Sequence, residues 1–256
     1  MGLDHELLTA SALESLMSDP CEPLAASKPS NDVSVTPLTD AESSAVRELR
    51  ERLMSEMPHW QAAAQREAEA HLDDFTLIRF VVARKPSLED AFQMFKLTMH
   101  WRSADEYAIG KVFADHHPAH PDSSSSTLEV ARTHFYAGFG GFTRDGAPFL
   151  VERLGRADLD GITREGDVVL GVMIDAYCAY LETALRLVRA ESFARGKLVK
   201  ALIIVDAAGV GLSTLRNISV IKKVASIGPQ YYPEVTYKVL IVNAPLIASV
   251  VWTAVR

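Results

Sequence analysis

The chain has 256 residues, of which 48% are hydrophobic and 23% are charged. This length allows one large domain or two small ones with a buried core, and the proportions exclude collagen-like, coiled-coil and fully disordered chains. The net charge of −7 disfavours a nucleic-acid binder held by bulk positive charge, so we expect no nucleic-acid partner. Residues 1–72 carry a net charge of −8 and the remainder +1, so an acidic front precedes a nearly neutral second part.

Three features of the sequence indicate a cytoplasmic protein. Cys21 and Cys178 have no spacing typical of a disulfide framework or a metal site, which fits a reducing compartment. The N-terminus lacks the basic start and apolar run of a signal peptide. The uncharged run 239–255 is interrupted by Pro245 and is shorter than the roughly 20 residues of a spanning helix, so we interpret it as a strand followed by a helix.

The first 114 residues predict an extension and a helical subdomain. Residues 1–39 are expected to be a disordered, acidic extension, since four prolines fall in residues 18–39, although residues 3–17 have the apolar spacing of a short amphipathic helix. Asp40 is a candidate cap for the next helix, and Ser87 with Asp90 resembles a capping box. Apolar stripes predict helices over residues 40–57, 73–85 and 88–102, within a helical subdomain that we assign to residues 40–114.

The second part predicts an α/β lobe. Residues 115–127 are assigned to a linker, because histidine, proline and serine dominate them. After it, apolar strands alternate with helices, which indicates a mixed, largely parallel sheet with flanking helices. We assign residues 128–256 to this lobe, and expect it to be incomplete because the chain stops after an apolar helix with no polar tail. The predicted strands are 136–142, 149–154, 198–205 and 237–242, and the predicted helices are 163–190, 213–227 and 245–255.

The motifs that would indicate catalysis are incomplete. Asp206 ends an apolar strand, and Gly209 and Gly211 follow it, but neither a Gly-Lys-Ser/Thr loop nor the third glycine of a dinucleotide site is present. A tight turn explains these glycines, and an α/β enzyme built on Asp206 is kept as an alternative. The loop histidines have no companion ligands at fixed spacing, so we expect no metal and no cofactor; they are His116, His117 and His120.

Four segments stand in a fixed order along residues 73–256. They are DFTLIRF followed by ARK at 74–85, DGAP followed by VERLG at 145–155, IVDAAGVGL at 204–212, and YPE followed by IVNAP at 232–245. In this order they resemble the CRAL-TRIO lipid-binding family, which includes yeast-type phosphatidylinositol/phosphatidylcholine transfer proteins. The resemblance implies a non-enzymatic protein with a helical front subdomain and an α/β lobe that encloses an apolar lipid pocket. It also implies that the last strand and the lid of that pocket lie beyond Arg256.

The resemblance assigns a phospholipid headgroup site to three residues. In members that transfer phosphoinositides, the Arg-Lys pair ending the first conserved helix and the Glu after Tyr-Pro contact the inositol-phosphate headgroup, which implies Arg84, Lys85 and Glu234 here. A guanidinium can bind phosphate oxygens bidentately, and a carboxylate can accept hydrogen bonds from inositol hydroxyls. A purely structural role is the alternative, because cations complement the end of a helix dipole. Residues 200–203 lack the hydroxyl side chains of phosphatidylcholine-carrying members.

The resemblance also points to the wall of the acyl pocket. The predicted wall residues are Phe139, Phe149, Val151, Met173, Tyr177, Ile203, Val205, Val239, Ile241 and Leu246. Trp252 is a candidate for the pocket entrance, where an aromatic side chain suits a membrane interface. For each of these residues, ordinary packing in the core is the alternative.

From these observations we expect a non-enzymatic monomer that binds a phospholipid and transfers it between membranes, with phosphatidylinositol as the first candidate. Such a protein is cytoplasmic and contacts membrane surfaces transiently. The alternative is a lipid-independent regulatory or protein-interaction module of the same fold, with a protein partner bound through the N-terminal extension.

Overall fold

The structure is a computed structural model, and it describes residues 35–36, 38–104 and 136–255. The predicted helix over 3–17, the 115–127 linker and its three histidines lie outside the described residues. The boundaries at 114 and 127 lie outside them too, and the division of the chain into domains stays a prediction. In the part of the chain that is described, no helix is both long enough and apolar enough to cross a membrane.

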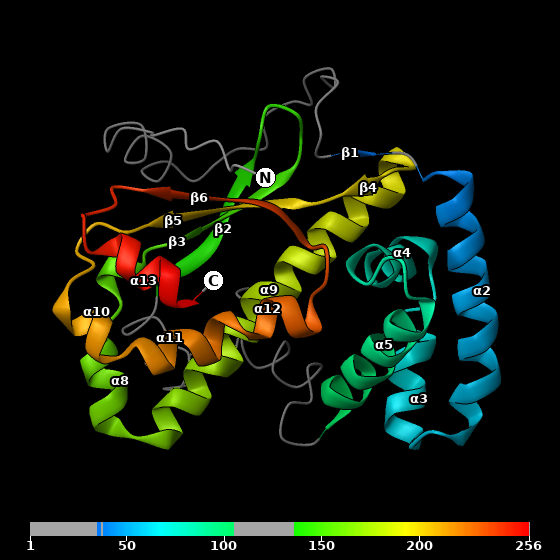
Figure 1. Ribbon diagram of the computed structural model, residues 1–256, viewed down its shortest axis with the longest axis horizontal. Helices are drawn as coiled ribbons and strands as arrows, with labels where there is room; N and C mark the ends of the chain where they lie inside the picture. Colours follow the sequence, from blue (N-terminus) through cyan, green and yellow to red (C-terminus); the bar gives the residue numbers. More distant parts are fainter. Residues whose placement is uncertain (1–34, 37, 105–135, 256) are drawn as a thin grey trace, which may run out of the picture.

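Four helices form the first part of the structure (Figure 1). They are α2 (Asp40–Glu56), α3 (Ala62–Glu69), α4 (Asp74–Ala83) and α5 (Leu88–Ser103), with a short 3-10 turn at Met57–His59. Thr39, rather than the predicted Asp40, caps α2 through a capping box with Glu42. Ser87 caps α5 as predicted, by accepting a hydrogen bond from the amide of Asp90. Helix α3 was not predicted, because its alanine-rich sequence has no broad apolar stripe.

The apolar stripes of these helices meet in one core. Leu49, Leu53, Leu77 and Phe95 are fully or almost fully buried there. Burying one such side chain stabilises the fold by about 1.5–3 kcal/mol relative to leaving it exposed. The helical part therefore has a core of its own, to which Leu198 of the second part also contributes.

The second part is built on a four-stranded sheet in the order β2-β3-β5-β6. Its strands are β2 (Ala137–Phe142), β3 (Pro148–Glu152), β5 (Ala201–Asp206) and β6 (Thr236–Val242). The β2/β3 hairpin is antiparallel, whereas β3/β5 and β5/β6 are parallel, which confirms the predicted mixed, largely parallel sheet. A separate two-stranded pair joins β1 (Val35–Thr36) to β4 (Leu198–Val199), so two residues of the extension that was expected to be disordered form a short strand.

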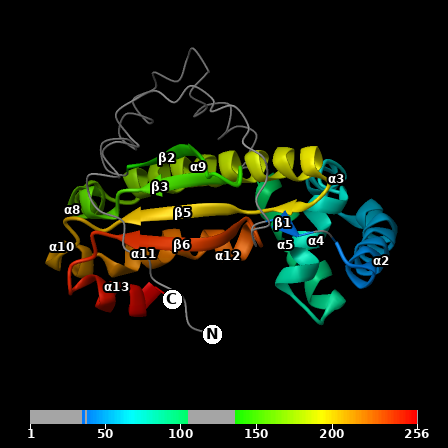
Figure 2. The same ribbon diagram turned by 90° about the horizontal axis from the view of Figure 1, so that it is seen from above.

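The helices of the second part lie on one side of the sheet, as the two views show (Figures 1 and 2). The predicted helix 163–190 is in fact two helices, because Gly166 has a positive φ of 84° that interrupts the helix. The predicted helix 213–227 is broken at Asn217 and Ser226 into shorter ones. The observed helices are α8 (Leu159–Glu165), α9 (Asp167–Arg195), α10 (Leu212–Arg216), α11 (Ile218–Ala225), α12 (Ile227–Tyr231) and α13 (Ala248–Val255).

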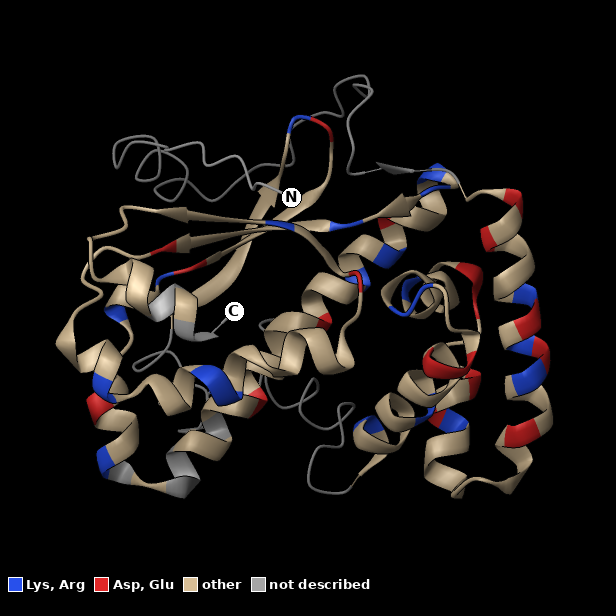
Figure 3. Ribbon diagram, in the orientation of Figure 1, with Lys and Arg blue, Asp and Glu red and all other residues tan. Residues whose placement is uncertain are grey.

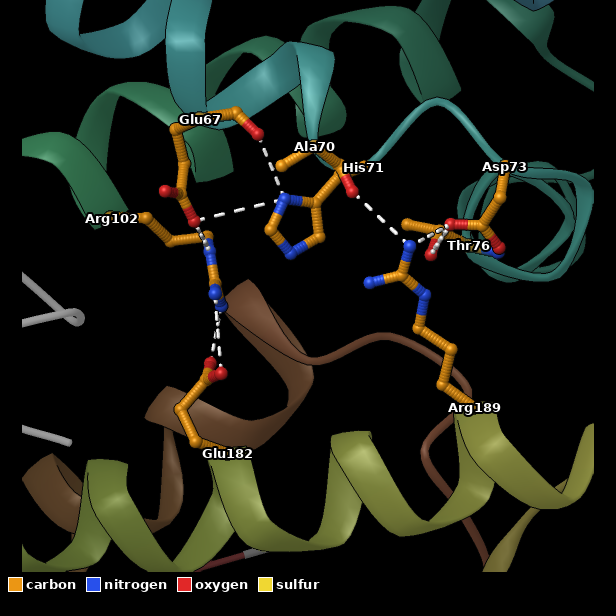
Figure 4. A network of polar contacts seen from close by, with 8 residues as sticks. All are labelled: Glu67, Ala70, His71, Asp73, Thr76, Arg102, Glu182 and Arg189. Atoms are coloured by element: carbon orange, nitrogen blue, oxygen red, sulfur yellow. Dashed lines mark hydrogen bonds and ion pairs between the residues drawn. The ribbon is translucent and has the colours of Figure 1, made fainter. Parts of the chain in front are cut away.

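A buried polar network joins the two parts (Figure 4). Arg102 of α5 lies between Glu67 of α3, at 2.6 Å, and Glu182 of α9, which it contacts through a pair of hydrogen bonds. Arg189, about two helical turns further along α9, forms an ion pair with Asp73 at 2.6 Å. Desolvation and the nearby Arg102 lower the pKa of the adjacent His71, so this imidazole is held neutral between charged neighbours. The network fixes the helical part against α9.

Candidate functional site

A cavity of about 550 Å³ lies between the helix-covered face of the sheet and helices α9, α11 and α12. Its volume is within the range of about 300–1,000 Å³ of small-molecule pockets. The walls are mostly apolar, and the charged residues among the described ones that line them are Arg84, Glu152 and Glu234. Strands β5 and β6 carry few charged residues (Figure 3). From the helices, the wall includes Met173, Tyr177 and Leu181 of α9 and Val220, Ile221 and Val224 of α11.

The sheet contributes apolar side chains through its register. Ile203 pairs with Val239, and Val205 pairs with Ile241, so the four side chains lie on one face of the two parallel strands. All four line the cavity. The intervening Leu202 and Ile204 point to the opposite face and pack with Phe149 and Val242. The alternate side chains of β5 and β6 thus line the cavity on one face of the sheet and pack in an apolar cluster on the other.

The charged rim of the cavity is formed where α4 ends and β6 begins. Arg84 is the C-cap of α4 and lines the cavity, with its side chain exposed. Its guanidinium donates to the carbonyl of Ala83 at 3.1 Å, and among the described residues no carboxylate forms an ion pair with it. Arg84 is therefore a cation at the rim that can still accept an anionic group.

Glu234 lines the same cavity as Arg84. Its backbone adopts a positive φ of 56°, and its carbonyl accepts a hydrogen bond from the buried Arg79. Its carboxylate forms an ion pair with Lys200, which precedes β5. Arg79 and Lys200 were not predicted, because their contacts with Glu234 join residues far apart in the sequence. A ligand that uses the Glu234 carboxylate must share it with Lys200.

Lys85 does not join this rim. Its ammonium pairs with Glu42 of α2 at 2.6 Å, and the residue does not line the cavity. The hydrogen bonds from Lys85 and from the Thr39 backbone lower the pKa of Glu42 to about 2. Of the three predicted headgroup residues, the structure therefore brings together Arg84 and Glu234 and places Lys85 in a contact with the helical part.

Six of the predicted wall residues line the cavity and four do not. The six are Met173, Tyr177, Ile203, Val205, Val239 and Ile241. Phe149 and Val151 belong to the cluster on the opposite face of the sheet, because side chains alternate along β3. Phe139 is 45% exposed and contacts Phe142 on the edge strand β2, and Leu246 is 96% exposed in the loop after β6. The side chain of Trp252 lies outside the described residues.

The residues kept for an enzymatic alternative have structural contacts. The Asp206 carboxylate accepts hydrogen bonds from the amide of Ala208 and the side chain of Asn243, each at 3.0 Å. Gly209 has a positive φ of 95° and lies against the backbone of Gly155. These contacts close the turn after β5, in agreement with the tight turn predicted from the sequence. No group of three or more potential metal ligands occurs among the described residues.

Comparison with known proteins adds an independent line of observation. The CRAL/TRIO domain profile matches residues 132–256. The Sec14 cytosolic factor of Schizosaccharomyces pombe is 31% identical over 180 residues, which cover 68% of this chain and 58% of that protein. The CRAL-TRIO domain-containing protein YKL091C of Saccharomyces cerevisiae is 29% identical over 190 residues, 72% of this chain and 59% of that protein.

A plant relative is matched over a smaller share of its length. The phosphatidylinositol/phosphatidylcholine transfer protein SFH13 of Arabidopsis thaliana is 26% identical over 213 residues, which cover 80% of this chain and 30% of that protein. The chain thus spans less than two thirds of the length of each of these three relatives.

Proposed function

Because the chain belongs to the CRAL-TRIO family, we propose that it binds a phospholipid in the 550 Å³ cavity and transfers it between membranes. Phosphatidylinositol is the first candidate ligand. In this proposal the protein is a non-enzymatic monomer of the cytoplasm that contacts membranes transiently. The observation that carries the proposal is the combination of an apolar wall with a cationic rim in one cavity.

The apolar wall matches the energetic need of a lipid carrier. Each CH₂ group exposed to water costs about 0.8 kcal/mol, so a ~16-carbon acyl chain costs on the order of 13 kcal/mol outside a membrane. A carrier must offset this cost with a pocket that is nearly free of polar groups. Ile203, Val205, Val239 and Ile241 supply such a surface on the sheet, and Met173 supplies part of the facing wall.

The rim supports an anionic headgroup. Arg84 can donate two parallel hydrogen bonds to phosphate oxygens. Lys200 adds a second positive charge beside Glu234, whose carboxylate can accept hydrogen bonds from inositol hydroxyls. Residues 200–203 offer no hydroxyl side chain for a choline phosphate, which favours inositol over choline. One relative, SFH13 of Arabidopsis thaliana, is named as a phosphatidylinositol/phosphatidylcholine transfer protein.

The test is transfer of labelled phosphatidylinositol from donor to acceptor vesicles by the full chain. Arg84→Ala is expected to lower the transfer rate about tenfold, because charge-assisted hydrogen bonds to a phosphate are lost. Lys85→Ala is the matched control, since Lys85 is the neighbouring cation that contacts Glu42 instead of the cavity. Equal transfer by the wild type and Arg84→Ala would show that the headgroup assignment is wrong. Absence of any transfer or lipid retention would favour the lipid-independent interaction module.

A further inference from the structure

Glu152 is an acidic residue in the apolar wall of the cavity. It ends strand β3, and it pairs in parallel register with Val205 of β5, which also lines the cavity. The facing helix α9 contributes Tyr177 and Met173 to the same wall. Neither the rim cations nor any other basic residue forms an ion pair with Glu152 among the described residues.

Two buried polar atoms at this point lack hydrogen-bond partners within the described part of the chain. They are Oε1 of Glu152 and the hydroxyl of Tyr180 on α9. The Tyr180 hydroxyl is near enough to oppose the rise in the pKa of Glu152, but the two groups do not form a well-aligned hydrogen bond. Leaving such groups unsatisfied is costly, and native proteins do so rarely outside functional sites.

The carboxyl is also suited to a neutral partner. Burial raises the pKa of Glu152 to about 7, so the protonated form is well populated at neutral pH. A protonated carboxyl can both donate and accept a hydrogen bond. An uncharged hydroxyl group can do the same, whereas a phosphate at this position would meet a partly negative group.

The register of the sheet gives the distance between this point and the rim. Glu234 precedes β6, whose first residue Thr236 pairs with Ala201. Lys200, which pairs with Glu234 at the rim, comes five residues before Val205, the partner of Glu152, and this separation corresponds to about 16 Å at ~3.3 Å per residue. A zigzag chain of C–C bonds of about 1.5 Å advances ~1.25 Å per carbon, so about thirteen carbons span this distance.

We propose that Glu152, supported by the neighbouring Tyr180, forms a second polar subsite, which binds a hydroxyl group carried on the hydrocarbon chain of the ligand about thirteen carbons from its anionic head. The hydroxyl both donates to and accepts from the protonated Glu152 carboxyl, which lines the cavity, while the head binds at the rim. The inference rests on the proposed function in one respect, namely that the cavity holds an acyl chain with its head at the rim. The subsite favours hydroxylated acyl chains over unsubstituted ones.

The test compares three fatty acids in one sample. The full chain is incubated with equimolar stearate, 3-hydroxystearate and 12-hydroxystearate, and the acids retained after gel filtration are measured by mass spectrometry. Two added hydrogen bonds predict about tenfold more 12-hydroxystearate than stearate. The 3-hydroxy isomer, whose hydroxyl lies near the head, is expected at the level of stearate. Because the three acids compete for the same molecules, the ratio does not depend on how much protein is folded.

Variants of the subsite sharpen the result. Glu152→Met is expected to reduce the ratio of 12-hydroxystearate to stearate to about one, whereas Glu152→Gln, which still donates and accepts, keeps most of the preference. Tyr180→Phe is expected to give an intermediate ratio. Equal retention of the two acids by the wild type, an unchanged ratio in Glu152→Met, or retention of none of the three acids would each overturn the subsite.

A parallel incubation with vesicles that contain phosphatidylinositol separates the two proposals. Retention of phosphatidylinositol without a preference for 12-hydroxystearate would overturn the subsite and leave the proposed function standing. A preference for 12-hydroxystearate that depends on Glu152, without retention of phosphatidylinositol, would support the subsite and contradict the proposed phospholipid ligand.

Discussion

Glu152 makes the stability of the protein depend on pH in an unusual direction. Its pKa is about 7 in the folded chain and 4.5 as the ordinary value, because burial disfavours the ionised carboxyl. As the pH rises between these values, the unfolded chain releases the proton while the folded chain retains it. The free energy of unfolding therefore falls, by up to about 3 kcal/mol once the pH exceeds the folded pKa.

Glu152→Gln removes the titration and keeps the shape of the side chain. We expect the free energy of unfolding of this variant, relative to that of the wild type, to rise with pH. The variant minus wild-type value is expected to be about 2.5 kcal/mol larger at pH 8 than at pH 5. Urea unfolding followed by tryptophan fluorescence at the two pH values measures the difference. Glu51→Gln, at an exposed position on α2, is the control for the exchange of glutamate for glutamine itself. A Glu152→Gln difference that is the same at both pH values would refute the reasoning.

Two further predictions concern the fold, and both are measured as changes in the free energy of unfolding. Arg102→Met leaves Glu182 buried without its partner and is expected to destabilise the protein by about 3–5 kcal/mol. The double variant Arg102→Met with Glu182→Leu should recover much of this loss. Equal stability of the single variant and the wild type would show that the network in Figure 4 does not hold the two parts together. Gly155→Ala would place a Cβ atom 1.8 Å from the carbonyl oxygen of Ala208, so we expect a loss above about 2 kcal/mol, while Gly171→Ala, in open space on α9, should be neutral or gain up to ~1 kcal/mol. Similar effects of the two alanines would contradict the close backbone crossing at Gly155.

The pattern of apolar residues predicted the strands of the four-stranded sheet and its mixed, largely parallel character. Strands β5 and β6 are apolar over their whole length, and the structure shows why, since Ile203 faces the cavity while Leu202 and Ile204 pack on the opposite face. Ser87 was recognisable as a cap because its partner, Asp90, is only three residues away. Local signals of this kind are contained in a short stretch of sequence.

The face of a strand was harder to predict than the strand itself. Phe149 and Val151 were expected in the pocket wall, but the structure turns the other set of β3 side chains, which ends with Glu152, toward the cavity. Because side chains alternate with a period of two, a one-residue difference in orientation exchanges the two sets. Hydrophobicity alone favours the phenylalanine and the valine for an apolar pocket, so it cannot reveal that a glutamate takes this position.

Contacts between distant residues were not predictable from the sequence. Arg102 meets Glu182 across 80 residues, and Lys200 meets Glu234 across 34. Lys85, next to Arg84 in the sequence, turns to Glu42 because α2 packs beside α4. Which of two adjacent cations belongs to the cavity is decided by tertiary packing rather than by a local motif.

The central claim is that the cavity holds a phospholipid, and its most direct test is lipid mass spectrometry on the purified chain. The protein is incubated with mixed vesicles of phosphatidylinositol and phosphatidylcholine and reisolated, and an organic extract is then analysed. We expect close to one phosphatidylinositol per chain, with little phosphatidylcholine, and a clear loss of the bound lipid in Arg84→Ala but not in Lys85→Ala. If the reisolated protein contains neither phosphatidylinositol nor phosphatidylcholine, the result would contradict the claim.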